Sequence, residues 1–205
     1  MSQQPHGPRA HHRPVPKREA FFDEIEGGVD PALVSEAADR AATLLVRGAR
    51  ASADDAVADR LLHLAETEGI EAIAEVWAEG APDTLAGCLW RLYLLRAWVH
   101  AEPARAATEF DAGRRRVPVA ELLAGVADPP GPDQLRTMID QVLRGIATSD
   151  FADVLFRAAA FARVVAGGRA TLAPHPADPD PGVRRMLLVS EQLEAAGHLE
   201  LAGRL

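Results

Sequence analysis

Two arginines interrupt an otherwise apolar run in the middle of the chain. The run, TLAGCLWRLYLLRAWV, spans residues 84–99, and Arg91 and Arg96 are its only charged side chains. A guanidinium buried without a partner is very costly. Each arginine must therefore pair with an internal acid, reach water along its own stem, or hold an acidic ligand. The last alternative would place Arg91 or Arg96 in a small-molecule pocket.

A second basic group consists of Arg114, Arg115 and Arg116, which follow one another after a short predicted helix. The group is either a solvated loop or a docking point for an acidic protein or a nucleic-acid backbone. Arginines on phosphates give salt-sensitive binding that does not depend on base sequence. The net charge of the chain, -8, opposes nucleic-acid binding.

The residue types of common catalytic sites are sparse. The chain has one Cys and one Tyr, and it lacks a glycine-rich phosphate loop and the G-x-S-x-G turn of serine hydrolases. Cys88 and His100 lie too far apart along one helix to act as nucleophile and base. Glu194 and His198 do not have the spacing of a helical two-metal site. The sequence therefore predicts no catalytic residue, no metal ligand and no cofactor.

The first 30 residues differ from the rest of the chain. Residues 1–18 carry several basic side chains and no acidic one, with little apolar content, which predicts a disordered basic arm. The following segment, FFDEIEGG, places Phe21, Phe22 and Ile25 among acids. These three residues either form a short motif that folds on a partner or pack onto the protein's own core. We predict a helical domain over residues 31–205.

Apolar residues recur at spacings of three and four through most of that domain, and no run alternates as a strand would. Together with the high content of Ala, Leu, Glu and Arg, this spacing predicts an all-α fold, a single bundle of about 7–10 helices. The segment 84–99 is apolar on nearly all sides and should be central. The other predicted helices cover about 31–45, 52–69, 70–78, 103–113, 118–126, 132–146, 150–166 and 182–196.

Two stretches, TLAGCLWRLYLLRAWVH and PPGPDQLRTMIDQVLRGIATSDFADVLFRAAAFARVVAGG, resemble all-helical proteins of unknown role from high-GC Gram-positive bacteria. The resemblance covers roughly residues 31–170. It implies a helical fold and carries no catalytic motif, so it assigns no functional residue.

Location and function follow from these features as expectations. The N-terminus lacks the apolar segment of a signal peptide, and the run at 84–99 is too short and too charged to cross a bilayer, so we expect a cytoplasmic protein. The leading hypothesis is a non-enzymatic protein that presents a groove or face to another protein. One alternative is a nucleic-acid-associated accessory protein that uses the basic arm and Arg114–Arg116. Another is an enzyme or binder of small acidic ligands that uses Arg91 or Arg96.

Overall fold

The computed structural model of the protein describes residues 31–47, 74–116, 128–143, 150–173 and 181–205. All of them belong to one compact unit, Pro31–Leu205. The basic arm, the FFDEIEGG segment and the predicted helices 52–69 and 118–126 lie outside the described residues.

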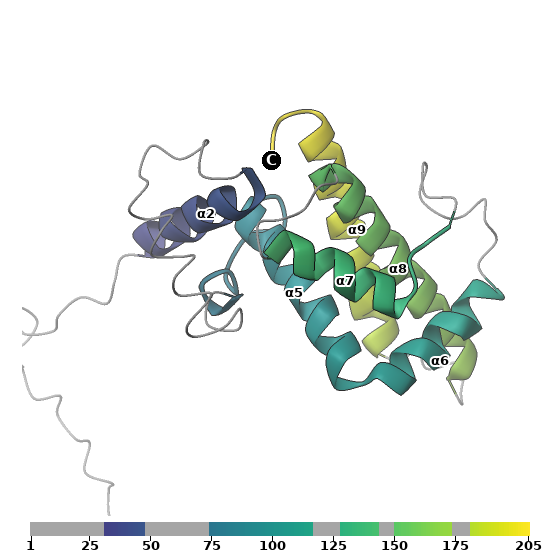
Figure 1. Cartoon of the computed structure of the whole chain (residues 1–205). Coiled ribbons are helices and arrows are strands. Elements are labelled where there is room, and N and C mark those ends of the chain that lie inside the picture. The colour runs from purple at the N-terminus through teal and green to yellow at the C-terminus, as the bar shows by residue number, and fades with distance from the viewer. Residues whose placement is uncertain (1–30, 48–73, 117–127, 144–149, 174–180) are drawn as a thin grey trace, which may run out of the picture. The chain divides into compact units, whose positions relative to one another are not determined.

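The all-α prediction is confirmed: the described residues form helices that pack together, and no strand occurs among them. A helical turn at 74–76 precedes the long apolar helix of the chain. Figure 1 shows the arrangement of the helices. Their bounds are Pro31–Arg47 (α2), Leu85–Ala101 (α5), Pro103–Arg114 (α6), Pro132–Leu143 (α7), Phe151–Leu172 (α8) and Pro181–Leu201 (α9).

Local signals in the sequence set where these helices begin. The Oγ1 atom of Thr84 accepts a hydrogen bond from the backbone N–H of Gly87 at 3.1 Å and caps α5. Asp150 caps α8 in the same way, through the N–H of Ala152 at 3.0 Å. The other four helices, α2, α6, α7 and α9, each begin at a proline. Proline has no backbone N–H, and the N–H groups of a first helical turn have no partner within the helix.

Helix α8 packs against α9, α6 and α7, and most of its residues are buried. It runs antiparallel to α9: the Oγ atom of Ser190 donates to the carbonyl of Ala159 at 2.9 Å, and the ring of Phe156 meets that of His198. The short side chains of Ala158–Ala160 are all fully buried. They allow the backbones of neighbouring helices to approach closely.

Helix α5 was predicted to be central, and it packs against each of the other described helices, although α8 buries more of its residues. Leu89 and Leu92 of α5 are fully buried, but Leu94 is 42% exposed, and Trp90 and Tyr93 stack on each other half-buried. Helix α5 is therefore buried on all sides at its start, at residues 85–89, and partly exposed farther along. Each alanine of α8 buries little apolar surface, because its side chain is a single methyl group. The hydrophobicity of the α8 sequence is therefore a poor guide to how many of its residues are buried.

Close approach of α6 and α8 corrects the predicted end of α8 at residue 166. A Cβ atom on Gly168 would lie 1.7 Å from the carbonyl oxygen of Glu109, and one on Gly113 would lie 1.9 Å from that of Val164. Gly168 is thus needed for helix contact rather than helix termination, and α8 continues to Leu172.

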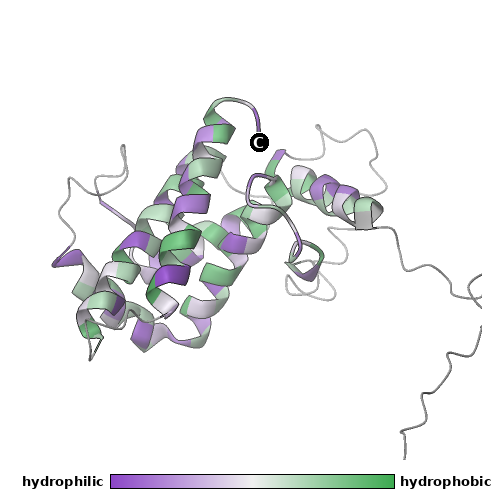
Figure 2. Ribbon diagram, turned by 180° about the vertical axis from the view of Figure 1, so that it is seen from behind, coloured by the Kyte–Doolittle hydropathy of each residue, from purple (hydrophilic) through white to green (hydrophobic). Residues whose placement is uncertain are grey.

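The predicted end of α9 near residue 196 is also wrong. Gly197 lies under the ring of Phe156, where a Cβ atom would come within 2.8 Å of the ring, and the helix continues to Leu201. Gly203, two residues beyond the end of the helix, has a φ of 63°, which suits a glycine. Figure 2 shows hydrophobic and hydrophilic residues interspersed along α9. Leu188 and Leu201 of this helix are exposed to solvent.

Candidate functional site

Arg91 of α5 is held by neutral acceptors. Its Nε atom donates to Oε1 of Gln192 on α9 at 2.7 Å, and its Nη1 atom donates to the carbonyl of Gly87 at 2.7 Å. Burial lowers the pKa of the Arg91 guanidinium, although the negative charge of Asp83 partly offsets this effect. Arg91 therefore joins α5 to α9.

Arg96 of α5 forms an ion pair with Asp140 of α7, and both side chains are largely buried. An internal acid is one of the alternatives that the sequence left open for this residue. Arg91 and Arg96 bind different helices, and neither lines either of the two hollows described below. A role for either guanidinium in holding an acidic ligand stays a prediction.

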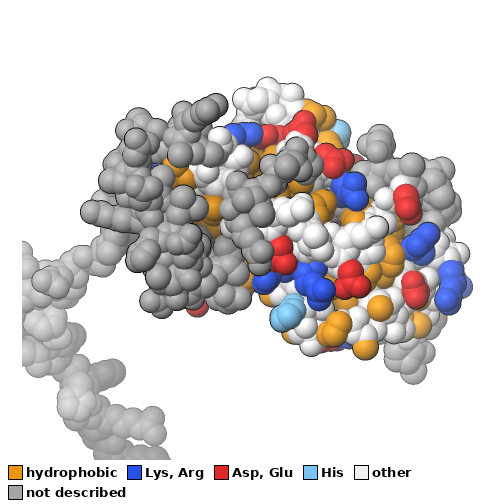
Figure 3. All heavy atoms as spheres, viewed as in Figure 1, with side chains coloured by type: hydrophobic (Ala, Val, Ile, Leu, Met, Phe, Trp, Pro, Cys, Tyr) orange, Lys and Arg blue, Asp and Glu red, His pale blue; other side chains and the backbone are white. Residues whose placement is uncertain are grey.

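Arg114, Arg115 and Arg116 lie at the end of α6. Arg114 is the last residue of the helix and approaches Asp128 at 3.8 Å, while Arg115 and Arg116 form an exposed turn. On the face that Figure 3 shows, basic and acidic side chains are interspersed. The predicted contact residues Phe21, Phe22 and Ile25 lie outside the described residues.

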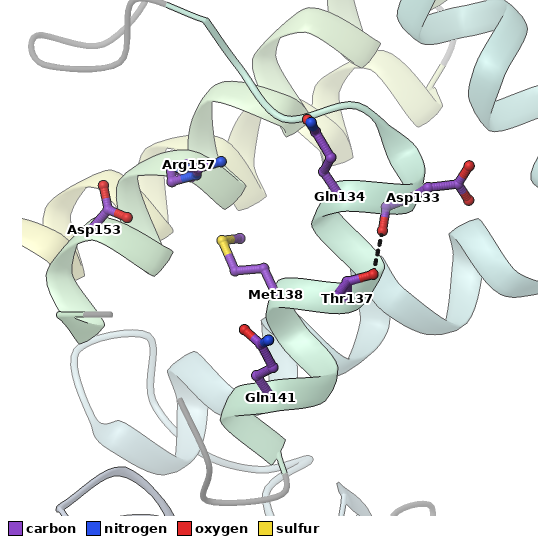
Figure 4. A pocket seen from close by; sticks show the side chains of 7 residues that line it. All are labelled: Asp133, Gln134, Thr137, Met138, Gln141, Asp153 and Arg157. Atoms are coloured by element: carbon purple, nitrogen blue, oxygen red, sulfur yellow. Dashed lines mark hydrogen bonds between the residues drawn. The ribbon is translucent and has the colours of Figure 1, made fainter. Parts of the chain in front are cut away.

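A groove that the sequence analysis did not predict separates α7 from the first turns of α8 (Figure 4). Its volume is about 430 Å³. Gln134, Met138 and Gln141 recur at helical spacing and form the α7 wall, while Asp153 and Arg157 stand one turn apart on α8. The complete lining is Asp133, Gln134, Thr137, Met138, Gln141, Asp153 and Arg157.

Arg157 has an unusual environment in this groove. Its Nε atom is buried, and within the described part of the chain no hydrogen-bond acceptor contacts it. Figure 4 shows the half-buried side chain of Met138 extending from α7 towards α8 below Arg157. Asp153 lies one turn before Arg157, yet the structure places no ion pair between them.

The other two arginines of α8 each have an acidic partner on a neighbouring helix, which Arg157 lacks among the described residues. Arg163 pairs with Glu194 of α9 at 2.8 Å, and Arg169 pairs with Glu109 of α6 at 2.6 Å. All three arginines interrupt the same Ala-rich helix, and the same cost of an unpartnered guanidinium applies to each. An arginine within an apolar helical segment needs a partner, and this argument, made for Arg91 and Arg96, applies equally to Arg157. The sequence signal that could have identified Arg157 is thus its position in the Ala-rich segment 151–172.

A second, smaller hollow lies between the Pro82–Asp83 loop and α9. Its volume is about 200 Å³, and its lining is mainly apolar, with Leu188 and Leu199 on the α9 side. Gln192 contributes to it, but the oxygen of this amide already binds Arg91. This hollow contains no arginine, so the α7–α8 groove is the stronger candidate site.

The described residues contain no group of three or more His, Cys, Asp or Glu side chains placed to bind a metal ion. Cys88 is fully buried, with its Sγ atom 3.6 Å from the carbonyl oxygen of Pro82. Burial raises the pKa of the Cys88 thiol to about 12, although the charge of Arg91 opposes the shift. A protonated, enclosed thiol is a poor nucleophile.

The raised pKa gives a direct prediction for this single cysteine. Near pH 8, iodoacetamide is expected to alkylate Cys88 in the folded chain at least about a thousandfold more slowly than in the urea-unfolded chain, because thiolate is scarce and access is blocked. Mass spectrometry over a time course measures both rates. Equal rates in the two states would contradict the burial of Cys88.

No family model, curated protein or solved structure matches the chain. The resemblance to helical proteins of high-GC bacteria consequently stays a prediction. Among the described helices, none combines the length and the apolar character that crossing a membrane requires.

Proposed function

We propose that the chain is a non-enzymatic cytoplasmic protein that binds a segment of another protein in the α7–α8 groove. The observation that carries this proposal is the buried Nε atom of Arg157, which no acceptor within the described residues satisfies. Buried donors in folded proteins nearly always have an acceptor. Because the Arg157 side chain as a whole is only half-buried, a bound partner can supply an acceptor to its guanidinium.

The openness of the groove favours a protein segment over a small molecule. Gln134, Thr137, Gln141 and Asp153 of its lining are exposed to solvent. Small-molecule sites bury most of their ligand and are lined mainly by apolar side chains. A groove with polar walls and one methionine instead contacts one face of an extended or helical segment, as in helix-in-groove recognition.

Photo-crosslinking in the native host tests this proposal. A benzophenone amino acid replaces Thr137, whose exposed side chain lines the groove, and in a matched control it replaces the exposed Arg184 on α9. We expect a protein adduct that forms from position 137, is absent from position 184, and survives nuclease treatment. The same adducts from both positions would contradict binding at the groove.

The nuclease treatment also addresses the nucleic-acid alternative, for which the exposed turn at Arg115 and Arg116 is the supporting observation. Adducts that disappear with nuclease, together with DNA or RNA binding at about 50 mM salt, would favour that alternative. Removing residues 1–18 should then abolish the binding. We favour the protein partner because the net charge of the chain is -8.

A further inference from the structure

We infer that the segment bound in the α7–α8 groove presents one carboxylate to Arg157, between uncharged or basic residues, with an apolar side chain on Met138. This inference rests on the proposed function and specifies the chemistry of the partner at the same site.

The pairing of the α8 arginines supports a carboxylate. Arg163 and Arg169 each bind an acid of a neighbouring helix, whereas the structure shows no such pair for Arg157. A guanidinium presents its N–H groups as a fixed fork that matches the two oxygens of a carboxylate. In the structure no acid of the described residues pairs with Arg157, Asp153 one turn away included, and we assign the third acid to the partner.

The rim of the groove limits the charge of the segment. Asp133 and Asp153 line the groove with Arg157 and expose their carboxylates. Asp133 approaches Arg136 at 3.3 Å, whereas Asp153 forms no ion pair among the described residues. A uniformly acidic segment would be repelled by both aspartates, and like charges in close contact strongly disfavour a wrong partner. A single acid can pair with Arg157, and neutral or basic residues on either side of it are not repelled by Asp133 and Asp153.

The α7 wall fits the remaining parts of such a segment. Met138 is half-buried, and its flexible thioether can adapt to different apolar side chains. Gln141 exposes an amide that both donates and accepts, which suits a peptide backbone. The oxygen of Gln134 already accepts from the N–H of Gly131 at 3.1 Å, so this glutamine fixes the start of α7 instead.

Selection from a phage-displayed library of random peptides on the full chain tests the inference. We expect the selected peptides to share one Asp or Glu at a fixed distance from an apolar residue, without further acids nearby. Their binding to the Arg157→Gln variant should weaken roughly tenfold or more, since a charge-assisted bond is lost. Arg184→Gln removes an equal charge from an exposed site on α9 and should leave binding unchanged.

Two further variants separate the role of Arg157 from a general loss of charge or fold. Arg157→Lys keeps the charge but loses the planar fork, and it should bind with intermediate affinity. Arg157→Glu should select Lys or Arg at the peptide position where the parent chain selects an acid. Such a reversal cannot come from an unfolded protein, and its absence alongside unchanged selection of acids would overturn the inference.

Methionine methyl NMR locates the bound peptide on the folded chain. The chain has three methionines: Met138 lines the groove, Met186 is buried in α9, and Met1 is the first residue. A selected peptide should shift the Met138 methyl signal and leave that of Met186 in place. Acetate at the same concentration should have no effect, because it lacks the contacts of a segment. Equal shifts with acetate would assign the groove to small anions and overturn the inference.

The outcomes distinguish this inference from the proposed function. Peptides that bind Arg157→Gln as tightly as the parent chain, or that leave Met138 unshifted, overturn the carboxylate contact while protein binding stands. Failure of the Thr137 crosslink overturns the protein-binding function itself. Selected peptides without a shared acidic position also count against the inference.

Discussion

Replacing Glu109 by Leu is expected to lower the free energy of unfolding by about 3–5 kcal/mol. The carboxylate of Glu109 accepts hydrogen bonds from Nε of Arg169 at 2.6 Å and from Nε of Arg105 at 2.7 Å. The side chains of Glu109 and Arg169 are only 7% and 10% exposed. Removing the acid leaves the charge of Arg169 buried without its partner, which is the costly half of breaking a buried ion pair.

The remaining contacts of Arg169 explain why it cannot simply turn to water. Its guanidinium lies 4.7 Å from the centre of the Trp98 ring, and its Nη1 atom donates to the carbonyl of Gly182 at 3.3 Å. These contacts link α8 to α5 and to the start of α9. Arg105 is half exposed and can be solvated when Glu109 is lost, so the penalty comes mainly from Arg169.

Urea denaturation followed by circular dichroism measures this change. The matched control is Glu102→Leu, which removes an acid from the exposed pair with Arg105 and should cost less than about 1 kcal/mol. The double variant Glu109→Leu/Arg169→Met should recover most of the loss, because no buried charge is left. A Glu109→Leu chain as stable as the parent would show that this pair is not buried in solution.

Replacing Gly168 by Ala is expected to destabilise the protein by about 3 kcal/mol, at or above the upper end of the range for overpacking. An added Cβ atom would overlap the carbonyl oxygen of Glu109 at 1.7 Å and its carbonyl carbon at 2.7 Å. Both atoms belong to the backbone of α6, so no side chain can rotate to relieve the overlap, and the two helices must move apart.

Gly168→Ala is a strict test because the expected change in stability is opposite in sign to that of an ordinary helical Gly→Ala substitution. In an open helix Gly→Ala stabilises by roughly 1 kcal/mol, because alanine is the better helix former. Gly131→Ala is the control, since the nearest atom to its added Cβ is a ring carbon of Phe110 at an ordinary 4.0 Å. We expect its denaturation midpoint to stay close to that of the parent chain. An increase in stability for Gly168→Ala would refute the close approach of α6 and α8.

Gly168 and Gly197 show which helix boundaries cannot be predicted from local sequence alone. The start of α8 near residue 150 was predicted correctly, because Asp150 acts on the N–H of Ala152, only two residues away. The ends of α8 and α9 were predicted wrongly because Gly168 and Gly197 also look like local stop signals. Their role depends on Glu109 and Phe156, which are distant in the sequence and close only after folding.

The sequence by itself determined the helical fold, since helix propensity, capping and the spacing of apolar residues act within a few turns. Only the tertiary structure decided which charges find partners. Arg157, Arg163 and Arg169 are the same residue type in one helix, yet the packing of α6 and α9 brings an acid to the last two alone. The α7–α8 groove has the same origin, because it exists only where two separately predictable helices meet.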